Sequence, residues 1–209
     1  MVSFNQLFTF VLLMSSKYNI DSSHSESHSM DVLHYADENY NSQLYFNPNL
    51  EKQLNVIHCS AILHDMCDKK YIDEEKGMKE IEYFLNDKIT PEELFYTKKI
   101  IESMSYSTVK KKGFPYLGEY ELAYHIVREA DLLSSYNFDR TLIYNLNRGN
   151  SLLSSYTNSL KLFEDRVFNY NKDKLFISEY AKQKSYILTV DSLQKISSWN
   201  RILYKTKAF

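Results

Sequence analysis

The sequence predicts an all-α protein with about seven to nine helices. Helix breakers are scarce, because the 209 residues include only four glycines and three prolines. Apolar residues recur at three- and four-residue spacing, and stretches that alternate apolar and polar residues as a strand does are few. We expect a single domain over residues 1–209, with a core over about 18–145 and C-terminal helices over 146–209 that pack on it.

The helix boundaries follow from apolar runs and from the few breakers. Phe8–Met14 predicts the core face of a first helix, because this run is half the length of a membrane span and follows no basic segment. Asn47-Pro48 precedes a helical segment over Leu50–Cys67. Thr90–Glu93 is a capping-box pattern with proline at the first helical position, so it predicts a helix that continues through Met104.

The second half of the chain predicts further helices. Gly113, Pro115 and Gly118 fall in one loop, after which Glu119–Tyr136 has a helical pattern. The tail Ser151–Phe209 carries more helical patterns, and Lys172–Lys174 is expected to connect two of them.

Charge and cysteine content narrow the functional classes. The formal net charge is −2, which gives no reason to expect binding to a specific nucleic acid or to an acidic membrane. Cys59 and Cys67 are eight residues apart, about 12 Å along a helix, too far for a disulfide. Two thiols in a chain of this size indicate a reducing compartment, so we expect a cytoplasmic protein. We expect this protein to be a monomer or a homodimer and to have no membrane partner.

Three segments combine apolar residues with side chains that bind metals. Asp21–Ala36 contains His24 and His28, which would share a helix face if the helix already included His24. Ile57–Lys70 contains the adjacent pair His64-Asp65 between apolar residues. Ala123–Leu133 contains Asp131, again flanked by apolar residues. Ionisable groups in such settings are costly unless they are paired, hydrogen-bonded or bound to a metal.

A set of two imidazoles and two carboxylates suits one divalent transition metal. We expect His28, His64, Asp65 and Asp131 to be its ligands, with manganese first and iron, nickel, cobalt, zinc or magnesium as alternatives. Such an ion neutralises phosphate charge and lowers the pKa of a bound water. The plain alternative is that a His-Asp pair arises by chance and that a helical aspartate is a cap or a surface residue.

The pattern resembles the HD-domain superfamily of metal-dependent phosphohydrolases, whose signature is a histidine, a His-Asp pair and a distant aspartate. The matching blocks are His28-x-x-x-Val32-x-x-x-Ala36, Ala61–Asp65 and Arg128–Leu133. This resemblance implies an HD-type helical bundle that carries a phosphohydrolase site.

Further blocks resemble the branch that includes bacterial nucleoside-triphosphate pyrophosphohydrolases, and the likeness covers about 21–144. They are Asp21-x-x-His24-x-x-x-His28, His64-Asp65-x-x-Asp68-x-Lys70 and Ile101–Ser107. Two positions depart from this branch, since Ser25 replaces its usual aspartate and Asp31 its usual arginine. An acid in place of a base lowers the positive charge near the expected phosphate site.

Several neighbours of the expected ligands are candidates for catalysis or substrate binding. Asp68, three residues after Asp65, could be a general base or hold a ligand in place, or it could simply pair with a lysine. His24 is a candidate phosphate contact or proton donor, against the alternative of a loop histidine. Lys70 could hold a phosphate as a point charge, or it could be solvated. Arg128 could clamp phosphate or orient Asp131, and an ion pair with a glutamate competes with these roles.

The loop Val109–Glu119 contains Lys110–Lys112 followed by Gly113-Phe114-Pro115. One interpretation is a mobile cover, in which Lys112 and its neighbours attract an anionic substrate and the aromatic residues contact a base. The other is a solvated basic turn.

These residues predict an enzyme that hydrolyses a nucleotide or a similar small phosphorylated molecule. The branch resemblance implies cleavage of a nucleoside triphosphate to a monophosphate and pyrophosphate. A nucleoside monophosphatase or a cyclic-nucleotide phosphodiesterase is the alternative within that class. A non-catalytic nucleotide-binding module, or a structural bundle with an incidental His-Asp pair, is the alternative outside it.

Overall fold

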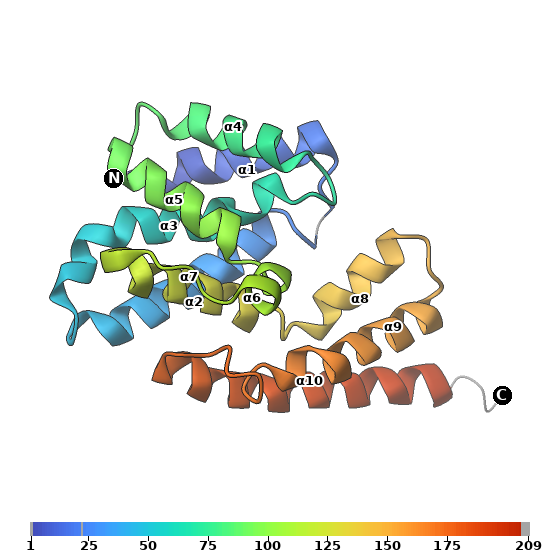
Figure 1. Cartoon of the computed structure of the whole chain (residues 1–209). Coiled ribbons are helices and arrows are strands. Elements are labelled where there is room, and N and C mark those ends of the chain that lie inside the picture. Colours follow the sequence, from blue (N-terminus) through green and yellow to red (C-terminus); the bar gives the residue numbers. More distant parts are fainter. Residues whose placement is uncertain (1, 22, 206–209) are drawn as a thin grey trace. The chain divides into compact units, whose positions relative to one another are not determined.

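The structure, a computed structural model, describes residues 2–21 and 23–205. Over these residues the chain forms ten α-helices and four 3₁₀ turns and contains no β-strand (Figure 1). The expected all-α class is therefore confirmed, and the helices are more numerous than the seven to nine expected, because several connections contain short helices of their own. Among the described residues, no helix combines the length and apolar character needed to cross a bilayer.

The chain divides into two compact units, residues 1–131 and 132–209. The division falls inside helix α7 (Glu121–Ser134), earlier than the boundary near residue 145 that we expected. The reason is that α8 (Phe138–Asn147) packs against α9 (Leu152–Asp165) and so belongs with the C-terminal helices.

The first unit contains seven helices or parts of helices among its described residues, joined by three 3₁₀ turns. In chain order they are α1 (Phe4–Tyr18), α2 (Glu26–Leu44), η1 (Pro48–Gln53), α3 (Leu54–Leu63), η2 (His64–Cys67), α4 (Glu74–Leu85), α5 (Pro91–Ser103), α6 (Tyr106–Lys112), η3 (Gly118–Tyr120) and the first part of α7.

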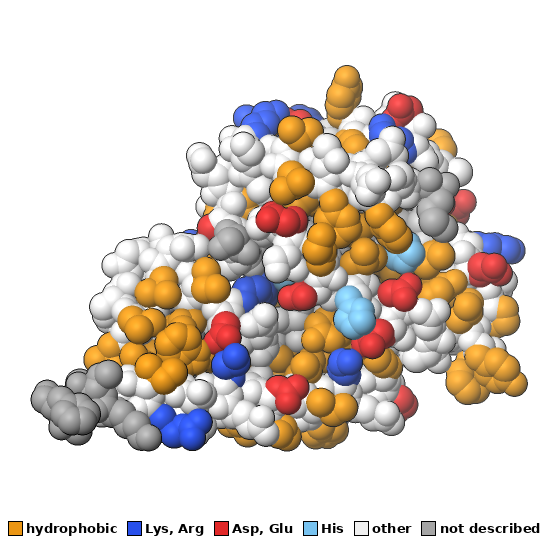
Figure 2. All heavy atoms as spheres, turned by 180° about the vertical axis from the view of Figure 1, so that it is seen from behind, with side chains coloured by type: hydrophobic (Ala, Val, Ile, Leu, Met, Phe, Trp, Pro, Cys, Tyr) orange, Lys and Arg blue, Asp and Glu red, His pale blue; other side chains and the backbone are white. Residues whose placement is uncertain are grey.

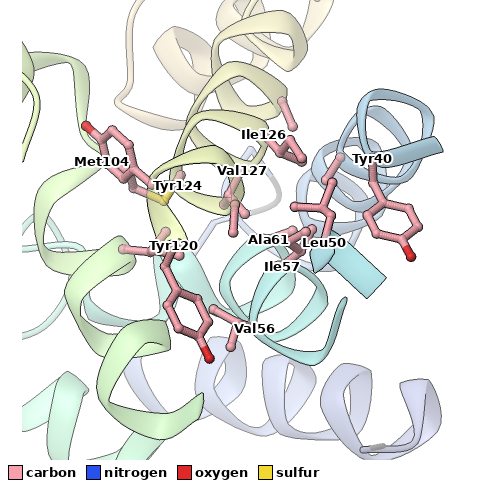
Figure 3. Packing of buried hydrophobic residues seen from close by; sticks show 14 of the residues in the cluster. Tyr40, Leu50, Val56, Ile57, Ala61, Met104, Tyr120, Tyr124, Ile126 and Val127 are labelled. Carbon is pink, nitrogen blue, oxygen red and sulfur yellow. The ribbon is translucent and has the colours of Figure 1, made fainter. Parts of the chain in front are cut away.

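Helix α3 lies at the centre of this unit, packed against α1, α2 and α5. Val56 and Ile57 face a cluster that includes Tyr124 and Val127 of α7 (Figure 3). Ile62 belongs to a second cluster, with residues of α1 and α4. Because α3 is buried all round, its sequence is apolar all round, and this explains the continuous run that precedes His64.

Two expectations for the helices are confirmed. The apolar run Phe8–Met14 lies within α1, and its buried residues Val11 and Met14 face the core. At the start of α5, the Thr90 hydroxyl accepts a hydrogen bond from the Glu93 amide at 3.2 Å, and Glu93 accepts from the Thr90 amide at 2.8 Å. This is the reciprocal capping box that the sequence predicts.

The segment Leu50–Cys67 is helical, as expected, but only Leu54–Leu63 of it is α-helix. A 3₁₀ turn precedes α3, and a second one, η2, begins at His64. Helix α4 packs against η2 so closely that a Cβ atom at Gly77 would lie 2.7 Å from Cα and Cβ of Cys67. Tertiary packing thus ends α3 where the local sequence shows no breaker.

Both cysteines are buried and free, as their spacing predicts. Burial raises the pKa of the Cys59 thiol and of the Cys67 thiol to about 12.

The second unit consists of the end of α7, α8, α9, the 3₁₀ turn η4 (Val167–Asn169) and α10 (Glu179–Lys205). Phe138 of α8 contacts Phe163 of α9, with ring centroids 5.2 Å apart. Trp199 of α10 donates a hydrogen bond to the Asp139 carboxylate at 2.7 Å. The segment 172–174 lies between α9 and α10 outside any helix, as the sequence predicts.

Candidate metal centre

Side chains from three separate segments converge on one point in the first unit. His28 Nε2 of α2 lies 3.1 Å from His64 Nε2 and 3.2 Å from Asp65 Oδ2, both on η2. Asp131 Oδ1 of α7 lies 3.4 Å from His28 Nε2 and 3.6 Å from His64 Nε2. The four residues expected as metal ligands therefore lie together.

The start of α2 is fixed to the end of α3. His28 is in the first turn of α2, and the neighbouring Ser29 hydroxyl donates a hydrogen bond to the Ile62 carbonyl at 2.9 Å. His28 and Ser29 are both buried, so little freedom remains for the imidazole. This contact holds His28 opposite the His-Asp pair that follows α3.

The backbone of α3 also sets the orientation of His64. Its Nδ1 lies 2.9 Å from the Ala61 carbonyl oxygen. Because a carbonyl oxygen only accepts, Nδ1 must carry the proton, and in the neutral ring the lone pair of Nε2 then points at His28 and the carboxylates. Proteins usually orient a metal-binding histidine in this way, through a hydrogen bond from the ring nitrogen that does not bind the metal.

The arrangement fits a divalent ion. Ligand atoms of His28, His64 and Asp65 all lie within 4.8 Å of one another. Asp65 Oδ2 is buried and makes no hydrogen bond, although His28 Nε2 is near. Two imidazole nitrogens facing each other at 3.1 Å and a buried carboxylate oxygen without a donor are poorly satisfied unless a cation lies among them. Two nitrogens and two carboxylates match the preference of Mn, Fe, Co, Ni or Zn.

Both carboxylates are held in the ionised form that a metal ligand needs. Burial alone would raise the pKa of Asp65, but the neighbouring His64 and His28 imidazoles hold it well below its usual value. Burial likewise opposes ionisation of Asp131, but the contact with His28 and the neighbouring His64 imidazole lower its pKa.

A second polar group joins three more of the expected residues. Lys70 Nζ lies 3.1 Å from His24 Nε2 and 3.1 Å from Asp68 Oδ2. The His24 ring centroid is 6.3 Å from that of His28, so this polar group lies next to the candidate metal centre. The structure thus brings His24, Asp68 and Lys70 together.

The local backbone structure at two of these residues differs from the structure that the sequence predicts. Helix α2 begins at Glu26, so His24 precedes the helix and does not share a helical face with His28. Asp68 has an extended backbone after η2, with ψ at 121°, and so does not continue a helix from Asp65. Its carboxylate accepts from the Lys70 amide at 2.9 Å and pairs with the Lys70 ammonium at 3.1 Å, so the pairing with a lysine is observed.

Ser23, Tyr71 and Asp21 hold His24, and sequence reasoning did not single out the first two. Ser23 and Tyr71 contact His24 Nδ1 at 2.7 and 3.1 Å, and both hydroxyls donate to the Asp21 carboxylate. Burial opposes ionisation of Asp21, but these hydrogen bonds lower its pKa overall. Asp21 opens the pattern that contains His24, whereas nothing in the sequence distinguishes Tyr71.

Arg128 is buried, one turn before Asp131 on α7. Its Nη2 lies 3.2 Å from His125 Nδ1 and 3.4 Å from Glu129 Oε1, so the ion pair with a glutamate is present. The Phe114 ring covers the guanidinium, whose carbon is 4.7 Å from the ring centroid. Burial lowers the pKa of Arg128 and, together with the charge of Arg128, lowers that of His125 to about 4.

Lys112 is the last residue of α6 and is exposed. Its proposed attraction of substrate stays a prediction.

On the face shown in Figure 2, histidine side chains lie beside carboxylate groups at the surface.

No protein-family model matches the chain. No curated protein matches it either. A Lactobacillus plantarum protein, whose crystal structure was determined as a structural genomics target, has a similar fold, with a TM-score of 0.68. The two chains are 18% identical over 98% of this chain and 100% of the other, so the similarity establishes the fold alone.

Proposed function

We propose that this protein is a metal-dependent phosphohydrolase of the HD type, acting on a nucleotide or a similar small phosphorylated molecule. The observation that carries the proposal is the convergence of His28, His64, Asp65 and Asp131 from α2, η2 and α7. A divalent ion held there would supply Lewis-acid stabilisation of phosphate charge and a water of lowered pKa.

The protons around His24 can be assigned from the contacts. Asp21 accepts the single hydroxyl protons of Ser23 and Tyr71. The Nδ1–H of His24 therefore donates to these hydroxyl oxygens, and Nε2 faces the Lys70 ammonium, which donates to it. The orientation of His24 thus depends on Asp21.

Lys70 lies between His24 and Asp68 and supplies a positive charge beside the candidate metal centre. We assign Lys70 and His24 to phosphate binding and charge neutralisation. Asp68 takes up a proton from the attacking water, as a general base.

The resemblance of the sequence blocks favours a nucleoside triphosphate as substrate, cleaved by one water to a monophosphate and pyrophosphate. A nucleoside monophosphatase is the second candidate. It is favoured by Asp31, an acid at a position where the resembling branch has a base. The two candidate activities assign the same residues to the metal and differ only in the bond that is broken.

The test is a panel of nucleoside mono-, di- and triphosphates and cyclic nucleotides, each with Mn, Mg, Ni and Co, with products separated by chromatography. We expect turnover with manganese that is lost in Asp65→Asn. Asp87→Asn, the same change at an exposed site, is the matched control. Pyrophosphate among the products supports the triphosphate reading, and free phosphate supports the monophosphatase. Nucleotide binding without turnover under any metal would refute the enzyme and favour a nucleotide sensor.

A further inference from the structure

The guanidinium of Arg128 lacks acceptors for most of its donors. Its Nε and Nη1 atoms are buried and make no hydrogen bond within the described chain, which leaves three of the five N–H groups unpaired. The Glu129 carboxylate reaches Nη2 of Arg128 at 3.4 Å. A structural arginine usually forms two parallel hydrogen bonds to its carboxylate, and this one does not.

An unpaired buried donor is costly, and a permanently charged one more so. The other Glu129 oxygen accepts from Asn39 at 3.2 Å, and neither carboxylate oxygen pairs with Nε or Nη1 of Arg128. His125 offers Nδ1 to Nη2, which leaves Nε and Nη1 as they are. The groups around Arg128 therefore leave room in the hydrogen-bond pattern for one more acceptor, and the oxygens of an anion would supply it.

Phe114 is the group that covers this guanidinium. Its ring packs on Arg128 and on His125, whose ring centroid is 4.9 Å away, yet 41% of Phe114 is exposed. The loop that carries it is bounded by Gly113 and Gly118, both with positive φ and with open space around them. A rotation of this ring would uncover the face of the guanidinium on which it packs.

Arg128 and Asp131 are three residues apart on α7, about 4.5 Å along the axis, and so share a side of the helix. We infer that Arg128 binds a second anionic phosphoryl group, linked to the one at the candidate metal centre, once Phe114 moves aside. This rests on the proposed function and deepens it. The substrate class is then a molecule with at least two linked phosphoryl groups.

The test compares two probes that this protein has no reason to consume. The manganese-loaded full chain is titrated calorimetrically with orthophosphate and with methylenebisphosphonate, in which a carbon atom joins two phosphonate groups. We expect the wild type to prefer the bisphosphonate. Arg128→Gln should weaken bisphosphonate binding about tenfold or more, the scale of lost charge-assisted hydrogen bonds, and leave orthophosphate binding unchanged. Lys79→Gln, which removes an exposed charge, is the matched control.

Equal bisphosphonate affinity in wild type and Arg128→Gln would overturn the inference. Should Arg128→Gln fail to fold by circular dichroism, Phe114→Ala keeps the arginine and removes its cover. That variant should bind the bisphosphonate with a higher association rate constant in stopped-flow experiments, and an unchanged rate constant would overturn the inference. Because neither probe is hydrolysed, absence of nucleotide turnover would refute the proposed function without deciding this test.

Discussion

Asp131 is the residue that connects α7 to the other expected ligands, since its carboxylate approaches both His28 and His64. Asp131→Asn keeps the shape of the side chain and removes its charge. We expect manganese affinity to fall by more than the 10- to 100-fold, roughly, that follows loss of a group merely supporting a ligand. Elemental analysis and competitive titration measure this, with Asp87→Asn as control. Unchanged affinity would exclude Asp131 as a ligand.

His125 gives the folded protein a specific dependence on pH. Its pKa of about 4 lies below the usual 6.5, because burial and the charge of Arg128 oppose protonation. As the pH falls below 6.5, the unfolded chain therefore binds a proton that the folded chain does not, and the free energy of unfolding falls until the pH passes the folded pKa.

His125→Gln removes this contribution. We expect its free energy of unfolding to fall less than that of the wild type between about pH 7 and pH 4.5. Urea unfolding at several pH values measures the difference, and the exposed His34 provides the control His34→Gln. Parallel curves for wild type and His125→Gln would contradict the low pKa.

At the scale of residues, the sequence predicts which side chains belong to the candidate metal centre better than it predicts which other residues contact them. The four converging residues could be found because ionisable groups within apolar helices need partners. The role of Tyr71 could not, because its contact with Asp21 bridges 50 residues and leaves no periodic trace. The cover over Arg128 depends in the same way on a loop whose path the sequence does not define.

At the scale of elements, the end of α3 is the feature that the sequence hides. Apolar residues continue through Met66 and Cys67, so periodicity predicts an unbroken helix. The structure instead places η2 against α4, and Gly77 permits this close approach. The capping box at Thr90 was predictable because it needs only residues three apart.

Gly77→Ala tests whether this packing positions η2. The added methyl group would lie 2.7 Å from Cys67 and 2.9 Å from the Met66 carbonyl oxygen, and these are largely backbone atoms that cannot turn away. Although alanine favours helices, we expect a net loss of about 1–3 kcal/mol in the free energy of unfolding, as for overpacked cores. We also expect weaker manganese binding, because η2 carries His64 and Asp65.

Urea unfolding and metal titration measure the two effects. Lys79→Ala, an exposed change on the same helix, is the control. If Gly77→Ala proved as stable as the wild type and bound manganese equally well, the close contact would not position the His-Asp pair.

At the scale of the whole molecule, the candidate metal ligands are separated by long stretches of chain, at positions 28, 64, 65 and 131. An ion bound by all four residues would bind the folded chain and not the unfolded chain, and would therefore stabilise the fold. A ligand present at 100 times its dissociation constant adds about 2.7 kcal/mol to the free energy of unfolding. For a chain of this size, about 2–4 °C in Tm corresponds to each kcal/mol.

We therefore expect excess manganese to raise Tm by roughly 5–10 °C, and a chelator to reverse this. Calorimetry of the wild type and of His64→Ala measures the effect. An equal rise in His64→Ala would show that manganese stabilises the protein elsewhere.

The all-α class could be predicted because scarcity of glycine and proline acts along the entire chain. The division into two units could not, because it depends on α8 packing with α9, and both helices have ordinary amphipathic patterns. Which helix meets which is decided by the shapes of the facing side chains, such as Phe138 and Phe163, and periodicity does not encode these shapes.

The two buried cysteines, Cys59 and Cys67, can report how fast the core of the protein becomes exposed to water. With pKa values raised to about 12, Cys59 and Cys67 are thiols and not thiolates at neutral pH, and only the thiolate reacts readily with an alkylating reagent. Maleimide should therefore modify this protein no faster than its core is exposed to water. Mass spectrometry of the modified chain would time that exposure, and Cys67, in the turn beside Asp65, would time it where the chemistry is proposed to occur.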